Sequence, residues 1–126
     1  MKLEIECIRD VLLELEGFPV DCYTPCDFKK SIKQHGDAAV DYTLAKLNEA
    51  GYIRADIRTL PNGQYDYYGI FDITFPGHQF LEKIRDNKVW SRTKAVTKAV
   101  GSTAFDVITQ VATSIITDVI SKQFKL

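Results

Sequence analysis

The sequence of 126 residues has few cysteines: Cys7, Cys22 and Cys26 are the only three. A chain of this size can bury a core without covalent staples, and an odd number of thiols favours reduced cysteines in a reducing compartment. The first ten residues, MKLEIECIRD, lack the basic segment and the continuous apolar segment of a secretory signal. We therefore expect a cytoplasmic protein without structural disulfides.

Long apolar runs are also absent. The most apolar stretch, residues 104–120, is interrupted by Asp106, Gln110 and Asp118, whereas a helix that crosses a bilayer needs about 20 mostly apolar residues. Its polar positions hold Thr, Ser and Asp, and not the Lys and Arg of helices that lie on membrane surfaces. We expect no association with a membrane.

Neither sign of charge dominates the composition. Sixteen Lys and Arg residues against 17 Asp and Glu residues give a formal net charge of -1, which creates no overall field that would attract nucleic acid. A local basic patch could still do so. Hydrophobic residues make up 45% of the chain, which is enough to form a core and excludes a disordered chain.

Motifs of known enzyme classes are absent from the sequence. It contains no phosphate-binding loop, dinucleotide fingerprint, H-E-x-x-H or G-x-S-x-G pattern. Cys22 and Cys26, with Cys7, His35 and His78, offer metal-ligand atoms, but a single C-x-x-x-C pair without a matched second pair is not typical of a zinc site. We expect no enzymatic activity, no cofactor and no bound metal.

Helical periodicity is present in the first half of the chain. Residues 2–16 carry apolar side chains at helical spacing. Two further helices are predicted over residues 25–34 and 37–50, and a tight turn at His35 and Gly36 joins them. Two helices joined in this way form a helix-turn-helix.

The third helix has a predicted cap and two predicted faces. Asp37 is a suitable N-cap, and residues 18–24, which precede the second helix, are either a brief strand or an extended connection. The inner face holds Val40, Leu44 and Leu47. The outer face holds Ala38, Asp41, Tyr42, Ala45, Lys46 and Glu49.

A β-hairpin follows the three helices. Residues 52–60 alternate, with Ile53, Ala55 and Ile57 on one face and Arg54, Asp56 and Arg58 on the other. Residues 61–63, Pro-Asn-Gly, form a turn, and residues 65–73 return as the second strand. This alternation indicates a half-buried antiparallel pair of strands.

The last third of the chain predicts three more helices. Thr74 caps the first of them, and Asn87 caps the second, which reaches Val100. The core side of the first holds Phe80, Leu81 and Ile84. In the second, Trp90 lies in phase with Thr93, Val96 and Val100, so these residues are predicted to face the core. Gly101 and Ser102 form a further break.

The final helix has a continuous apolar stripe, which we name the candidate dimer face. An isolated helix of this length is marginal in water, so the stripe needs a partner surface. It either folds back over the first helix or pairs with a second copy of the chain. The stripe consists of Phe105, Ile108, Val111, Ala112, Ile115, Ile116, Val119 and Ile120.

The order of these elements is that of a winged helix-turn-helix. Residues 44–53, LAKLNEAGYI, resemble the L-x-x-L-x-x-x-G-L-I ending of a winged-helix third helix, and residues 73–81, ITFPGHQFL, resemble the L-T-x-x-G-H-x-F-L that follows the wing. With residues 84–90, IRDNKVW, the chain resembles a small bacterial and phage family catalogued as a domain of unknown function. The resemblance implies a winged-helix fold and an origin in a phage or mobile element.

The predicted fold class is therefore α+β and mostly helical. It is a winged helix-turn-helix with a two-stranded antiparallel wing and additional C-terminal helices. Residues 1–86 form the winged-helix domain. Residues 87–126 form a helical extension that packs on this domain or serves dimerisation, within one structural unit.

The fold suggests a non-enzymatic, DNA-binding transcriptional regulator of a phage or mobile element, which is an inference by analogy. In such proteins the third helix enters the major groove of double-stranded DNA, and Lys and Arg on either side contact phosphates. The candidate DNA contacts are Lys29, Lys30, Lys33, Tyr42, Lys46, Arg54 and Arg58.

Acidic residues on the third helix favour an alternative. Asp37, Asp41 and Glu49 outnumber Lys46 there and would repel phosphates. The alternative is a protein–protein interaction module on a winged-helix scaffold that does not bind DNA, with a host or phage protein as its partner. A second basic stretch is either a nucleic-acid contact or a solubilising surface. It contains Lys83, Arg85, Lys88, Arg92, Lys94 and Lys98.

Overall fold

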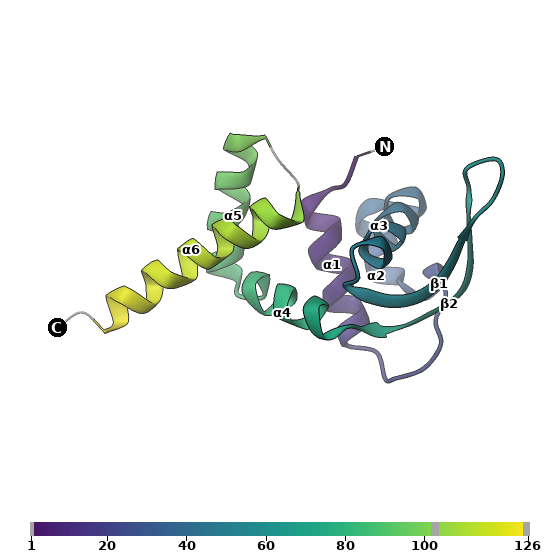
Figure 1. Cartoon of the computed structure of the whole chain (residues 1–126), viewed down its shortest axis with the longest axis horizontal. Coiled ribbons are helices and arrows are strands. Elements are labelled where there is room, and N and C mark those ends of the chain that lie inside the picture. The colour runs from purple at the N-terminus through teal and green to yellow at the C-terminus, as the bar shows by residue number, and fades with distance from the viewer. Residues whose placement is uncertain (1, 102–103, 125–126) are drawn as a thin grey trace. The chain divides into compact units, whose positions relative to one another are not determined.

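The computed structural model of the protein describes residues 2–101 and 104–124. Within these ranges the chain forms six α-helices and a two-stranded antiparallel sheet, so the protein is mostly helical and of the α+β class, as predicted (Figure 1). The chain divides into two compact units, Met1–His78 (unit 1) and Gln79–Leu126 (unit 2). This division lies before the domain boundary predicted after residue 86.

Unit 1 begins with three helices that contact one another pairwise: α1 (Ile5–Glu16), α2 (Lys29–His35) and α3 (Asp37–Glu49). The predicted inner face of α3 is confirmed, because its three apolar side chains are fully buried. The core of these helices includes Cys7, Ile8, Val11, Leu12, Val40, Leu44 and Leu47.

The second predicted helix is in fact interrupted. A 3-10 turn, η1 (Pro25–Asp27), precedes α2, and the backbone leaves the helical conformation at Phe28 (φ -84°, ψ 57°). The interruption accompanies complete burial of the Phe28 side chain, and tertiary burial overrides a local helical pattern. The predicted N-cap Asp37 is also wrong: the cap is Gly36, because the turn into α3 requires a φ of 89° that glycine adopts without strain.

The predicted hairpin is confirmed. β1 (Ile53–Thr59) and β2 (Tyr65–Ile73) pair antiparallel, with two register shifts at which β2 has one extra residue, Phe71 and Tyr68. Tyr23 joins the outer edge of β2 through one bridge, in which its N–H donates to the Ile70 carbonyl (2.7 Å) and its carbonyl accepts from the Ile70 N–H (2.8 Å). Residues 18–24 are therefore an extended connection with a single bridge, and not a strand.

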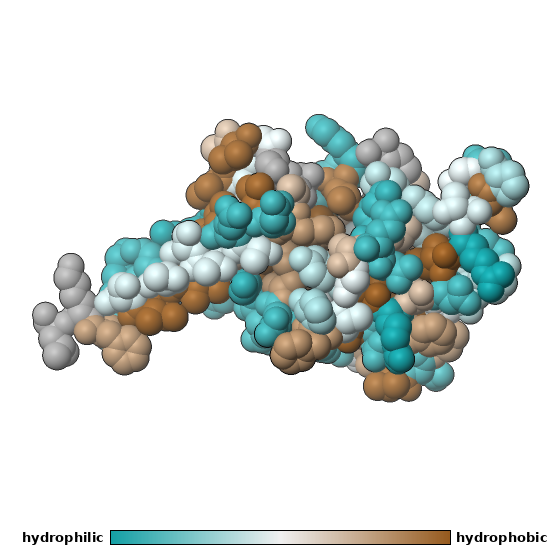
Figure 2. Space-filling view, viewed as in Figure 1, coloured by the Kyte–Doolittle hydropathy of each residue, from teal (hydrophilic) through white to brown (hydrophobic). Residues whose placement is uncertain are grey.

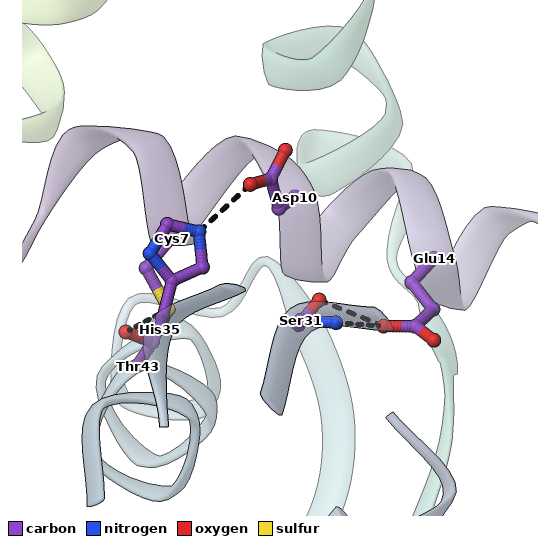
Figure 3. A network of polar contacts seen from close by, with 6 residues as sticks. All are labelled: Cys7, Asp10, Glu14, Ser31, His35 and Thr43. Carbon is purple, nitrogen blue, oxygen red and sulfur yellow. Dashed lines mark hydrogen bonds and ion pairs between the residues drawn. The ribbon is translucent and has the colours of Figure 1, made fainter. Parts of the chain in front are cut away.

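A carboxylate of α1 caps the first turn of α2 (Figure 3). Glu14 accepts hydrogen bonds from the backbone N–H groups of Lys30 (3.0 Å) and Ser31 (2.9 Å) and from the Ser31 hydroxyl (2.7 Å). These amides have no partner within their own helix, and the N-cap residue Phe28 supplies no side-chain bond. The cap of α2 thus comes from a different helix.

Two more polar contacts tie α1 to the helix-turn-helix (Figure 3). His35, the last residue of α2, places Nε2 2.7 Å from Oδ2 of Asp10. The hydroxyl of Thr43 in α3 donates to Sγ of Cys7 at 3.3 Å. Burial raises the pKa of the Cys7 thiol, so the sulfur stays protonated and uncharged in the core. Together these contacts fix both α2 and α3 against α1.

In α4 (Phe75–Ile84) the first turn lies against the start of the hairpin. The predicted N-cap is confirmed, because the Thr74 hydroxyl accepts a hydrogen bond from the Gly77 N–H at 3.2 Å. A Cβ atom at Gly77 would lie 1.9 Å from the Tyr52 carbonyl oxygen and 2.7 Å from Cγ2 of Ile73. Only glycine allows this close approach of the two backbones.

Unit 2 contains the rest of α4, together with α5 (Asn87–Val100) and α6 (Phe105–Gln123), which pack on each other. The helical form predicted for the last segment is confirmed. The predicted cap of α5 is wrong by one residue: Asp86 is the N-cap, and its carboxylate accepts from the N–H groups of Lys88 and Val89. A charged acceptor at this end also interacts favourably with the helix dipole.

One side of α5 is buried, and it holds Val89, Trp90, Thr93 and Thr97. The predicted burial of Trp90 and Thr93 is confirmed, whereas Val96 and Val100 are 43% and 64% exposed, contrary to prediction. Val96 lies about 120° around the helix from Trp90, at the edge of the buried side. Gly101 ends the helix with φ 77°; the other residue of the predicted break, Ser102, lies outside the described residues.

The contact at Gly77 predicts a strong effect of one methyl group. We expect Gly77→Ala to lower the free energy of unfolding by about 2–3 kcal/mol, because the new Cβ atom would overlap the Tyr52 carbonyl. Gly17→Ala is the matched control, since Gly17 has a right-handed conformation and ordinary contacts, and should change stability by less than about 0.5 kcal/mol. Urea denaturation followed by circular dichroism measures both; equal stability of the two variants would contradict the close contact.

The interhelical cap at Glu14 is tested in the same way. We expect Glu14→Ala to destabilise the chain by about 1–2 kcal/mol, because the first-turn amides of α2 and the Ser31 hydroxyl lose their acceptor. Glu4→Ala removes the same charge from an exposed residue that caps nothing with its side chain, and should leave stability nearly unchanged. A Glu14→Ala protein as stable as the Glu4→Ala control would show that the cap contributes nothing.

Candidate nucleic-acid interface

The exposed side of α3 is smaller and less basic than predicted. Ala45, predicted to face outward, is buried in unit 1 together with Thr43 and Leu44. Asp41 is half-buried, and its backbone carbonyl accepts a hydrogen bond from the Tyr67 hydroxyl of β2. Partial burial, with a smaller effect of Asp37, raises the pKa of the Asp41 carboxyl.

The cation of α3 is engaged within its own helix. Nζ of Lys46 lies 2.9 Å from Oε2 of Glu49 and 5.3 Å from the centre of the Tyr42 ring. Tyr42 is half-buried. Two of the predicted DNA contacts, Tyr42 and Lys46, are therefore adjacent, but a carboxylate neutralises the ammonium group.

The arginines of the hairpin also have acidic partners. Arg54 stands opposite Asp72 in the register, and its guanidinium donates twice to that carboxylate, at 3.0 and 3.3 Å. Arg58 lies over the Tyr68 ring (4.4 Å) with its Nε 3.7 Å from Asp56. Exposed ion pairs contribute about 0–1 kcal/mol each, so both arginines can exchange these partners for phosphates at low cost.

The lysines of α2 differ from these cations. Lys29, Lys30 and Lys33 are exposed, and within the described ranges none of their ammonium groups forms an ion pair. Lys30 contacts Glu14 through its backbone N–H and not through its ammonium group. Of the predicted DNA contacts, these three are the ones whose charge no neighbour in the described part of the chain neutralises.

Charge is distributed very unevenly between the two units. Residues 1–78 contain eight Lys and Arg against 13 Asp and Glu, whereas residues 79–126 contain eight against four. The near-neutral total conceals this separation. A count of charges over each predicted domain would have detected this separation in the sequence. The separation places the larger excess of positive charge outside the helix-turn-helix.

The candidate dimer face divides into a buried and an exposed part. Ile108, Ala112 and Ile115 are buried, and Phe105 packs edge-to-face on Phe80 with ring centres 5.4 Å apart. Val111 and Ile116 are partly buried. Figure 2 shows hydrophobic side chains along the edge of α6 toward its C-terminal end, where Val119, Ile120 and Phe124 are 40%, 50% and 81% exposed.

Residues considered for metal binding do not converge. Cys22 and Cys26 are exposed free thiols, and Cys7 is a buried one. Among the described residues no group of three or more His, Cys, Asp or Glu side chains could hold a metal ion.

In the same part of the chain, no helix combines the length and the apolar character needed to cross a membrane.

Comparison with known proteins relates the chain to one family. Searches of curated proteins and of solved structures found no match. The model of a family described as "Hypothetical protein (DUF2513)" matches residues 2–103, which include unit 1 and α5 and end before α6. Because this match covers most of the sequence, the chain belongs to the DUF2513 family.

Proposed function

We propose that this protein is a non-enzymatic winged helix-turn-helix protein that binds double-stranded DNA. The order of α1, α2, α3 and the β1–β2 hairpin supports this fold. Tyr23, in the extended segment between α1 and α2, forms a bridge to β2 of the hairpin. In this fold the hairpin serves as the wing and α3 is the helix that enters the major groove. A role as a regulator of a phage or mobile element extends the same proposal.

The observation that carries the proposal is the set of lysines on α2. In a helix-turn-helix the first helix of the motif crosses the DNA backbone, and contacts to phosphate position the protein on the duplex. Lys29, Lys30 and Lys33 are exposed and have no carboxylate partner among the described residues. Phosphates would be their natural counterions.

The arginines of the wing supplement these lysines. Arg54 and Arg58 lie on the outer face of β1 in exposed ion pairs, which phosphates can replace because such pairs are weak. Asp41 and Tyr42 on α3 offer groups for base edges, since a carboxylate accepts a hydrogen bond from the cytosine amino group. Specific contacts would therefore come from α3 and positioning contacts from α2 and the wing.

The acidity of unit 1 favours a second candidate. With 13 acidic against eight basic residues, unit 1 as a whole repels polyanions and attracts basic surfaces. The alternative function is therefore a protein-interaction module on the same scaffold, whose partner carries a basic surface and comes from the host or from a phage.

DNA binding is tested by fluorescence anisotropy of a mixed-sequence duplex titrated with the full chain. We expect an affinity that falls as salt is raised, and a loss of about tenfold or more in Lys30→Glu plus Arg54→Glu, because both cations are replaced by charges that repel phosphate. Lys30→Glu is matched against Lys2→Glu, which changes the charge of unit 1 equally at an exposed site elsewhere. Absence of binding by the unmodified chain at low salt would sink the proposal and leave the interaction module.

We also propose that a second copy of the chain covers the exposed end of the candidate dimer face. Val119, Ile120 and Phe124 are exposed there, and the charged residues beside them, Asp118 and Lys122, pair with each other at 3.2 Å, so two copies related by a two-fold axis would meet without a strong like-charge repulsion. We expect light scattering to report a dimer that Ile120→Lys converts to a monomer. Ser114→Lys, on the opposite side of α6, should leave the dimer intact, and a monomeric unmodified chain at high concentration would refute the idea.

A further inference from the structure

We propose that the exposed face of α5 is the main surface through which this chain neutralises DNA phosphates. This inference rests on the proposed DNA binding and assigns its electrostatic part to unit 2. The helix-turn-helix would then position the protein on the duplex and contact the base edges, whereas α5 would supply most of the affinity that depends on salt.

The composition of α5 is the first observation. Residues 87–100, NKVWSRTKAVTKAV, contain four cations and no carboxylate. Asp86 precedes them, but its carboxylate is engaged as the N-cap by the N–H groups of Lys88 and Val89, at 2.9 and 3.0 Å. In α4, Glu82 is paired with Arg85 at 2.8 Å.

The arrangement of these residues around the helix is the second observation. The buried side holds apolar residues and two threonines whose hydroxyls are hydrogen-bonded within the helix. The hydroxyl of Thr93 donates to the Val89 carbonyl (2.7 Å), and that of Thr97 donates to the Thr93 carbonyl (2.9 Å). The opposite side is exposed and alternates cations with small residues. It consists of Lys88, Ser91, Arg92, Ala95, Lys98 and Ala99.

The dimensions of this face suit a phosphate backbone. Lys88 and Lys98 are ten residues apart, which is about 15 Å along a helix. One strand of B-DNA carries a phosphate about every 3.4 Å of axis, so the face spans roughly four phosphates. The small side chains of Ser91, Ala95 and Ala99 leave no bulky group between the cations and the DNA.

The neighbouring helix α6 offsets only part of this positive charge, since it carries Asp106 and Asp118 against Lys122. On α6, Asp118 lies 3.6 Å from Arg92 and 3.2 Å from Lys122. Hydrogen bonding to Lys122, with a smaller effect of Arg92, lowers the pKa of the Asp118 carboxyl, so it is ionised at neutral pH. One carboxylate shared by two cations leaves Lys88, Arg92, Lys98 and Lys122 with a clear excess of positive charge.

A membrane surface is a poorer partner for this face. Helices that lie on lipid insert an apolar face that carries Trp, Phe or Leu. In α5 that side is already packed, because Trp90 is 3% exposed, and the large apolar residues of the helix that are exposed are Val96 and Val100. A hydrophilic polyanion therefore fits the exposed face better than an anionic bilayer.

The test compares full-length variants in duplex titrations at roughly 50 and 200 mM salt. We expect Lys88→Ala plus Lys98→Ala to weaken binding at low salt by about tenfold or more, and to reduce the slope of log affinity against log salt by roughly two, one for each lost phosphate contact. Lys88→Arg plus Lys98→Arg is the matched control, which keeps the charge and should bind as the unmodified chain does. Alanine favours a helix, so circular dichroism should show both variants folded.

The outcomes separate this inference from the proposed function. If the unmodified chain binds the duplex and the double alanine variant binds equally well with the same slope, the role of α5 is refuted while DNA binding stands. If the unmodified chain does not bind at low salt, the proposed function fails and this inference fails with it. Binding of vesicles rich in phosphatidylserine, lost in the alanine variant while duplex binding persists, would overturn the assignment in favour of a membrane.

Discussion

The arrangement of unit 1 depends on the capping of a short helix by a side chain from another helix. With seven residues, α2 (Lys29–His35) is too short to be stable alone in water. The carboxylate of Glu14 satisfies its first amides, and Asp10 contacts its last residue, His35. Since the turn at Gly36 leads directly into α3, the position of the whole helix-turn-helix follows from these contacts with α1.

Much of the fold could be predicted because it is encoded by local periodicity. The alternation at residues 52–60 and the apolar spacing of residues 105–120 correctly indicated a strand and a helix. The errors arose where tertiary contacts override local preference. Phe28 interrupts a helix as it enters the core, and Val96, at the edge of the buried side of α5, is left exposed.

The candidate site was harder to predict, because the charge state of a surface depends on pairs that sequence spacing does not reveal. The positions of Arg54 and Arg58 on one face of the strand followed from alternation. Their neutralisation did not, since Arg54 meets Asp72 only through the register of the hairpin. Lys46 and Glu49, three residues apart on one helix, are the pair that helical spacing could have indicated.

The separation of charge between the two units also bears on the behaviour of the protein during purification. A chain with a formal charge of -1 is expected to bind ion-exchange resins weakly. With an acidic half and a basic half, it can instead bind both anion and cation exchangers near neutral pH. Unlike halves of different molecules also attract each other at low ionic strength, so added salt should raise solubility by screening that attraction.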